Sequence, residues 1–79
     1  MNLNNAKLNE LYIVEMIDKD DKDAMKKLLS MGILPGIELK VMQKRPVIVF
    51  EVYNSRFAID EYLGEKIYVK ESNPHRENT

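Results

Sequence analysis

The sequence predicts a small domain that is mainly β with one α-helix, and three observations lead to this fold class. The chain has 79 residues, which is room for a single domain. One amphipathic stretch follows a run of aspartates and ends at a glycine and a proline. Around it, about five short segments are rich in β-branched and aromatic residues or alternate between apolar and polar. One short helix among about five strands indicates a small closed β-barrel of the SH3-like kind, with the helix inserted between strands.

The helix is the element that the sequence defines best. Asp20 or Asp21 is expected to cap its N-terminus, where carboxylates suit the helix dipole. Gly32 is placed for a left-handed C-cap, Pro35 prevents the helix from continuing, and Gly36 permits the turn into the next strand. The apolar stripe has the 3.6-residue period and consists of Ala24, Leu28 and Met31, widened by Met25 and Leu29.

Five segments are expected to form strands, namely residues 11–17, 37–43, 47–53, 56–60 and 66–70. The first is apolar on both faces, as in a strand that is covered on two sides. Asn54 and Ser55 form a two-residue break, and Asn54 tolerates the positive φ that tight hairpins need. Residues 61–64 are expected to form a single helical turn.

The two ends of the chain differ in the anchors that they offer. The first ten residues carry Leu3, Ala6 and Leu8 as candidate anchors. Residues 71–79 have no apolar side chain to bury, so we expect a disordered C-terminal tail. The predicted domain therefore spans residues 1–70.

The residue types that perform chemistry are scarce, and we expect no catalytic, cofactor-binding or metal-binding residues. There is no cysteine, and the single histidine, His75, lies in the predicted tail. No glycine-rich phosphate loop is present. The aspartates of residues 18–23 fail the calcium-loop pattern, because Lys22 and Leu29 stand where ligands are required. The sequence therefore predicts a protein that is not an enzyme.

Charge and hydropathy limit the partners. Twelve Lys and Arg against thirteen Asp and Glu give a net charge of −1, so nucleic acid is not the expected partner. An alternative remains open, a small nucleic-acid-binding barrel that uses a basic patch of Lys40, Lys44 and Arg45 with Lys26 and Lys27 of the helix. The longest apolar run is only residues 47–50, far short of a membrane span. We expect a cytoplasmic protein.

Apolar side chains in loops and on outer faces are the remaining candidates for function. After the helix, Ile33 is expected to fold back onto the helix and Leu34 to point outward. Tyrosines combine a large apolar area with a polar tip, which suits interfaces, whereas Phe57 is expected in the core. The predicted partner-binding residues are Met31, Leu34, Tyr53 and Tyr62. Self-association through the loop that carries Leu34 is a further expectation.

A continuous set of residues resembles a known family. Leu28-Leu29-x-Met31-Gly32-Ile33-x-Pro35-Gly36 is similar to the L-L-x-(L/M)-G-(L/I)-x-P-G signature of the FeoA domain. The likeness continues through the strand that Pro46 opens, through residues 56–59 and through residues 67–69. The motif residues Gly32, Pro35 and Gly36 have structural roles. The departures are Asn9 and Asn54 where glycine is usual, Asp60 where a basic residue is common, and Gly64 where alanine is common.

The resemblance implies an SH3-like barrel that serves as an accessory to the FeoB Fe²⁺ transporter, through the transporter's cytosolic GTP-binding domain. It thereby implies only an indirect link to the membrane. Related domains close some iron-dependent repressors of the diphtheria-toxin-repressor type, so a repressor-associated barrel is part of the alternative. Transition-metal binding is a family term that these residues do not support, because such ions prefer imidazole or thiolate ligands.

Overall fold

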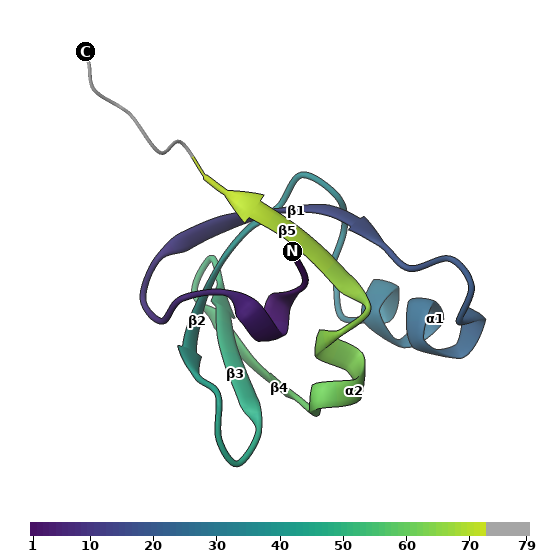
Figure 1. The fold of residues 1–79 in the computed structure, drawn as a ribbon. Helices are drawn as coiled ribbons and strands as arrows, with labels where there is room; N and C mark the ends of the chain where they lie inside the picture. The colour runs from purple at the N-terminus through teal and green to yellow at the C-terminus, as the bar shows by residue number, and fades with distance from the viewer. Residues whose placement is uncertain (73–79) are drawn as a thin grey trace.

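The computed structural model describes residues 1–72 as five strands, two short helices and one 3₁₀ turn (Figure 1). In chain order they are η1 (Leu3–Asn5), β1 (Leu11–Ile17), α1 (Lys22–Ser30), β2 (Glu38–Gln43), β3 (Ile48–Val52), β4 (Ser55–Ile59), α2 (Glu61–Gly64) and β5 (Ile67–Glu71). The strands form one antiparallel sheet in the order β4-β3-β2-β1-β5. The predicted fold class, a small SH3-like β domain with one main helix, is confirmed.

The barrel is left open between β4 and β5, which do not pair with one another among the described residues. The N-terminal segment lies along the outer edge of β5, where Val69 N–H donates to the Met1 carbonyl at 2.8 Å. Next to it, Asn4 Nδ2 donates to the Glu61 carbonyl of α2 at 3.0 Å. The expected closure by strand pairing is therefore replaced by η1, which covers the β5 edge and contacts α2 (Figure 1). Within residues 1–72, no segment pairs with the outer edge of β4.

The prediction that β1 is covered on both faces is wrong. Leu11 and Met16 are exposed, whereas Tyr12, Val14 and Ile17 are buried. The pairing of β1 with β5 shifts register between Val14 and Met16, which is a β-bulge. Because the bulge adds one residue, Val14 and Ile17 face the same side although they are three positions apart.

The α1–β2 connection matches the motif prediction closely. Asp21 is the N-cap, and its carboxylate accepts from Ala24 N–H at 3.0 Å. Gly32 has φ +85° and Gly36 has φ +97°, so both adopt the left-handed conformation. Gly32 N–H donates to Leu29 O at 2.9 Å, and Ile33 N–H donates to Leu28 O at 3.0 Å. These two bonds form a Schellman motif, and its apolar residue, Ile33, is fully buried as expected.

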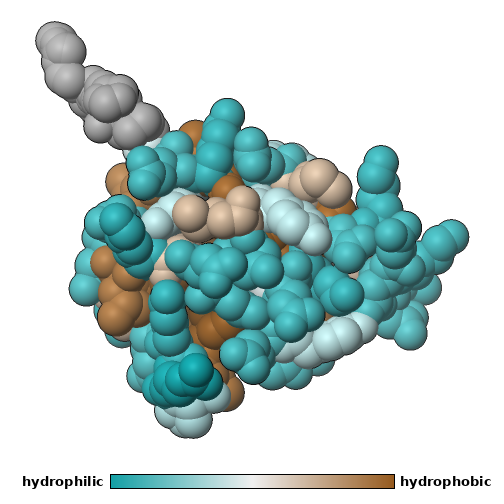
Figure 2. Space-filling view, viewed as in Figure 1, coloured by the Kyte–Doolittle hydropathy of each residue, from teal (hydrophilic) through white to brown (hydrophobic). Residues whose placement is uncertain are grey.

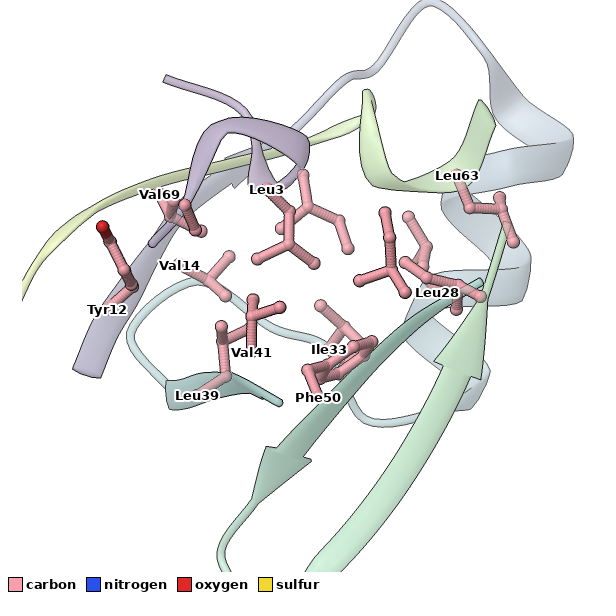
Figure 3. Close-up of a cluster of buried hydrophobic side chains, with 14 of the residues drawn as sticks. Leu3, Tyr12, Val14, Leu28, Ile33, Leu39, Val41, Phe50, Leu63 and Val69 are labelled. Atoms are coloured by element: carbon pink, nitrogen blue, oxygen red, sulfur yellow. The ribbon is translucent and has the colours of Figure 1, made fainter. Parts of the chain in front are cut away.

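The core lies inside the curved sheet, with α1 and the N-terminal segment contributing to it (Figure 3). Leu3 and Ala6 are fully buried, as expected for anchors, whereas Leu8 is exposed. Tyr12 is buried too, and its hydroxyl accepts from Lys7 N–H at 2.9 Å, so the polar tip is satisfied at the rim. Phe57 is half-buried rather than buried, and its ring stacks against Phe50 with centroids 5.7 Å apart.

Two details differ from the sequence expectations at the C-terminal end. The β3–β4 turn consists of Tyr53 and Asn54, one residue earlier than expected, and the positive φ (+55°) belongs to Tyr53 and not to Asn54. Strand β5 continues to Glu71, and Ser72 N–H donates to Leu11 O at 3.0 Å. Residues 73–79 of the predicted tail, including His75, lie outside the described residues.

Replacing Gly32 by alanine is expected to lower the free energy of unfolding by about 1–2 kcal/mol, because φ +85° is unfavourable for a residue with a Cβ. No heavy atom lies within 4 Å of the position that the Cβ would take, so the loss reflects backbone conformation alone. Gly32→Asn, which tolerates the left-handed region, should lose clearly less. Urea unfolding of the two variants measures this, and equal losses would contradict the conformational explanation.

Candidate partner-binding surfaces

The acidic side chains of the described residues form no metal-binding group, and several of them have structural roles. Within residues 1–72 no three His, Cys, Asp or Glu side chains are grouped so that they could hold a metal ion. The aspartates before α1 have structural partners instead. Asp18 Oδ1 accepts from Asp20 N–H at 2.9 Å and Asp18 Oδ2 lies 3.8 Å from Lys66 Nζ, while Asp21 caps the helix. No helix among residues 1–72 is long and apolar enough to cross a bilayer.

The loop after α1 presents one apolar side chain to solvent. Leu34 is 48% exposed, whereas Ile33 beside it is fully buried. Met31 is half-buried and packs against the core, so only part of its side chain is available for contact. The loop is held in place by Gly36 N–H, which donates to Val14 O at 2.7 Å. Leu34 therefore stands on a rigid backbone.

Tyr53 is the most exposed large hydrophobic side chain of the described residues, at 81%. It borders a groove of about 200 Å³ whose other lining residues are Leu11, Glu38, Leu39, Lys40 and Glu51. A tyrosine with positive φ is uncommon, since its Cβ disfavours this region. The turn therefore holds an exposed aromatic ring in an unfavourable conformation, next to the apolar side chain of Leu11.

Tyr62 lies at a different place, in a groove of about 360 Å³ between α1 and α2. Lys66 Nζ is 5.0 Å from the centroid of the Tyr62 ring, which is a cation–π geometry. The groove is lined by Asp21, Asp23, Ala24, Lys27, Asp60 and Leu63 besides Tyr62. Asp60 is the N-cap of α2 and accepts from Leu63 N–H at 2.8 Å.

The predicted contact residues do not form one surface. Tyr53 precedes β4 and Tyr62 follows it, so the five-residue strand, about 17 Å long, separates them. Their two grooves share no lining residue. In Figure 2 the apolar areas of the visible face are likewise separate and small, with hydrophilic side chains between them.

The basic side chains of the nucleic-acid alternative do not gather either. Lys40 pairs in register with Glu51 on the neighbouring strand, and both line the Tyr53 groove. Lys27 faces the groove that holds three aspartates. Lys44 and Arg45 line a separate cavity of about 110 Å³ near Asn4 and Glu61.

Two of these features were not predicted from the sequence. Leu11 is exposed because it lies on the outer face of β1, opposite to Tyr12 and Val14, and the sequence carries no signal of this because residues 11–14 are all apolar. The capping role of Asp60 had a signal, since an aspartate three residues before Leu63 at the start of a helical turn is a typical N-cap pattern.

Replacing Tyr53 by asparagine is expected to raise the free energy of unfolding by about 0.5–1 kcal/mol, because asparagine tolerates the left-handed region better. The ring is mostly exposed, so little packing is lost. Urea unfolding measures the gain, and Tyr53→Phe, which keeps the conformational cost, should leave stability unchanged. A destabilised Tyr53→Asn variant would show instead that the ring packs firmly against its groove.

With this geometry established, known proteins show where the chain belongs. The FeoA domain model matches residues 1–71. The crystal structure of an iron uptake regulatory protein, FeoA, has 29% sequence identity and a TM-score of 0.81, with 91% of this chain and 96% of that chain covered. No curated protein sequence matches the chain significantly.

More distant structures share the fold alone. The FeoA of Stenotrophomonas maltophilia, described as an SH3 domain protein and complexed with zinc, has 22% identity and a TM-score of 0.76 over 89% of each chain. A manganese-dependent transcriptional repressor has 17% identity and a TM-score of 0.84, with 91% of this chain and 41% of that chain covered. The match of the domain model to nearly all described residues decides the assignment: the chain belongs to the FeoA domain family.

Proposed function

We propose that this protein is a non-catalytic accessory of ferrous iron uptake, which acts by contact with the cytosolic GTP-binding domain of a FeoB-type Fe²⁺ transporter. The observation that carries the proposal is the FeoA domain match over residues 1–71, together with the 29% identity to an iron uptake regulatory protein. The S. maltophilia FeoA is suggested to be a ferrous iron transport activating factor, which is the same class of role. The proposed location is the cytoplasm, with the transporter as the link to the membrane.

The composition of the described surface supports contact rather than chemistry. Leu34, Tyr53 and Tyr62 are exposed on a rigid scaffold, and exposed apolar side chains of this size suit protein interfaces. Because the two tyrosines lie on separate parts of the surface, a partner would contact one of these parts or wrap around both. We propose Leu34 as the central contact, since the Schellman motif and Gly36 hold its loop in a fixed conformation that needs little ordering on binding.

Nucleic-acid binding is less well supported. The lysines and arginines of the proposed patch are dispersed, and two of them face acidic side chains. The likeness to the manganese-dependent repressor is a likeness of fold at 17% identity and carries no argument for DNA binding.

Replacing Leu34 by aspartate is expected to weaken binding to the soluble GTP-binding domain of a FeoB-type transporter by at least about tenfold, because a charge would be buried at the contact. Leu8→Asp is the matched control, since Leu8 is a leucine of nearly equal exposure, 46%, outside the predicted contact. Titration calorimetry or co-purification measures both variants.

The outcomes separate the function from the surface. Wild-type protein that fails to bind the transporter domain in either nucleotide state contradicts the proposed function. Wild-type protein that binds while both aspartate variants bind equally well contradicts only the Leu34 contact. Circular dichroism of Leu34→Asp checks that the variant is folded before its affinity is compared.

A further inference from the structure

Strand β4 has one paired edge and one free edge. It is the last strand in the sheet order and pairs only with β3. No backbone hydrogen bond joins residues 55–59 to any other described segment. At the opposite end of the sheet the edge is covered, because the N-terminal segment pairs with the outer edge of β5. An open edge of this kind is a template for another strand.

The hairpin geometry identifies which backbone groups face outward. Tyr53 and Asn54 form a two-residue loop, so the closing pair, Val52 and Ser55, is a hydrogen-bonded pair. Hydrogen-bonded and non-hydrogen-bonded pairs alternate along an antiparallel ladder. Arg56 and Ala58 therefore belong to non-hydrogen-bonded pairs with β3, and their N–H and C=O groups point to the free edge.

The outward N–H and C=O groups of one β4 strand can pair with the same groups of a second β4 strand. If two β4 strands run antiparallel about a two-fold axis at Phe57, Arg56 of one copy lies opposite Ala58 of the other. Each such pair exchanges two hydrogen bonds, so the outward groups of Arg56 and Ala58 are all satisfied. We propose that the free edge of β4 binds a second copy of this chain in this register, which forms a two-fold symmetric dimer with a sheet continuous through both copies. This proposal does not depend on the proposed transporter contact.

The side chains of β4 support a second copy as the occupant. Phe57 faces the inner side of the sheet but is only half-buried, because no strand lies beyond it. In the proposed register the two Phe57 side chains face each other across the axis in a non-hydrogen-bonded pair, where side chains approach most closely. The Phe50–Phe57 stack, with centroids 5.7 Å apart, would then continue into the second copy.

The charges on the outer face are also compatible with this pairing. Arg56 lies opposite the small, uncharged Ala58 of the other copy, so no like charges meet. Within each copy Arg56 keeps its ion pair with Glu51, whose carboxylate lies 3.7 Å from Arg56 Nε. The register also brings the Tyr53–Asn54 turn of one copy to the level of Asp60 of the other, where β4 ends and α2 begins.

Two substitutions at the exposed Ala58 test the register, because side chains of opposite charge there should change the dimer affinity in opposite directions. Ala58→Glu places a carboxylate opposite Arg56 of the other copy, whereas Ala58→Lys places a like charge there. A cross-strand ion pair changes the association constant by about 1.4- to fivefold, and the axis creates two of them. Sedimentation equilibrium should therefore show Ala58→Glu dimerising about two- to thirtyfold more tightly than wild type, and Ala58→Lys more weakly by a similar factor.

A cysteine variant gives an independent test, because the chain has no cysteine of its own. Residues facing each other in a non-hydrogen-bonded pair have Cα atoms about 4.5 Å apart, which suits a disulfide. Oxidised Phe57→Cys should form a covalent dimer, whereas Ser55→Cys, about 13 Å from its own copy in this register, should not.

Four outcomes decide the matter. Opposite shifts for the two Ala58 variants and selective crosslinking at position 57 support the dimer. A monomer for wild type and Ala58→Glu alike at about millimolar concentration would overturn it. Equal effects of Glu and Lys would also overturn it, as would a dimer that Leu34→Asp disrupts and the Ala58 variants do not.

Discussion

Gly32 turns the chain back at the end of α1, and the position of the helix depends on this turn. Its left-handed conformation allows Ile33 N–H to bond to Leu28 O and directs the Ile33 side chain into the core. Four residues after Gly32, Gly36 turns the chain again, so that Gly36 and Ile37 exchange hydrogen bonds with Val14 of β1. The seven-residue connection is thus fixed to the helix through Ile33 and to β1 through Gly36 and Ile37, and Leu34 lies exposed between these two attachments.

The N-terminal segment has a comparable effect at the open side of the barrel. Leu3 and Ala6 fill the core from this side, and Met1 and Asn2 pair with the edge of β5. Gly64 is part of the same arrangement, since a Cβ there would meet the Asn4 amide and lie 2.7 Å from Ile48 Cδ1. Because Gly64 has no side chain, η1 can lie close to α2. Protection of β5 in this way leaves β4 as the single open strand edge of the described sheet.

The functional surfaces follow from this division between a covered and an open side. Three aspartates of the described chain are used for structure: Asp21 and Asp60 cap helices, and Asp18 pairs with Lys66. What the fold leaves for partners is apolar and aromatic, at the Leu34 loop, at the β3–β4 turn and beside α2. The proposed accessory role uses these side chains as contacts with a partner.

The sequence alone determined the local features of the fold. A glycine and a proline in fixed positions, a capping aspartate and two hydrophobic periods are signals that lie within a few residues of one another, so they define α1, its Schellman motif and most strand positions. The absence of cysteine and the balanced charge, likewise, are properties of the sequence itself. The FeoA signature added the family, because its motif residues are those that the turn geometry requires.

Only the tertiary structure decided which side chains reach the surface together. The β1 bulge exposed Met16, and the shifted hairpin placed the positive φ on Tyr53, because strand pairing and not local preference sets the register. Tyr53 and Tyr62 were separated by β4, and Met31 was partly buried by packing against the core. Such outcomes depend on contacts between segments far apart in the chain, which no local pattern of residues encodes.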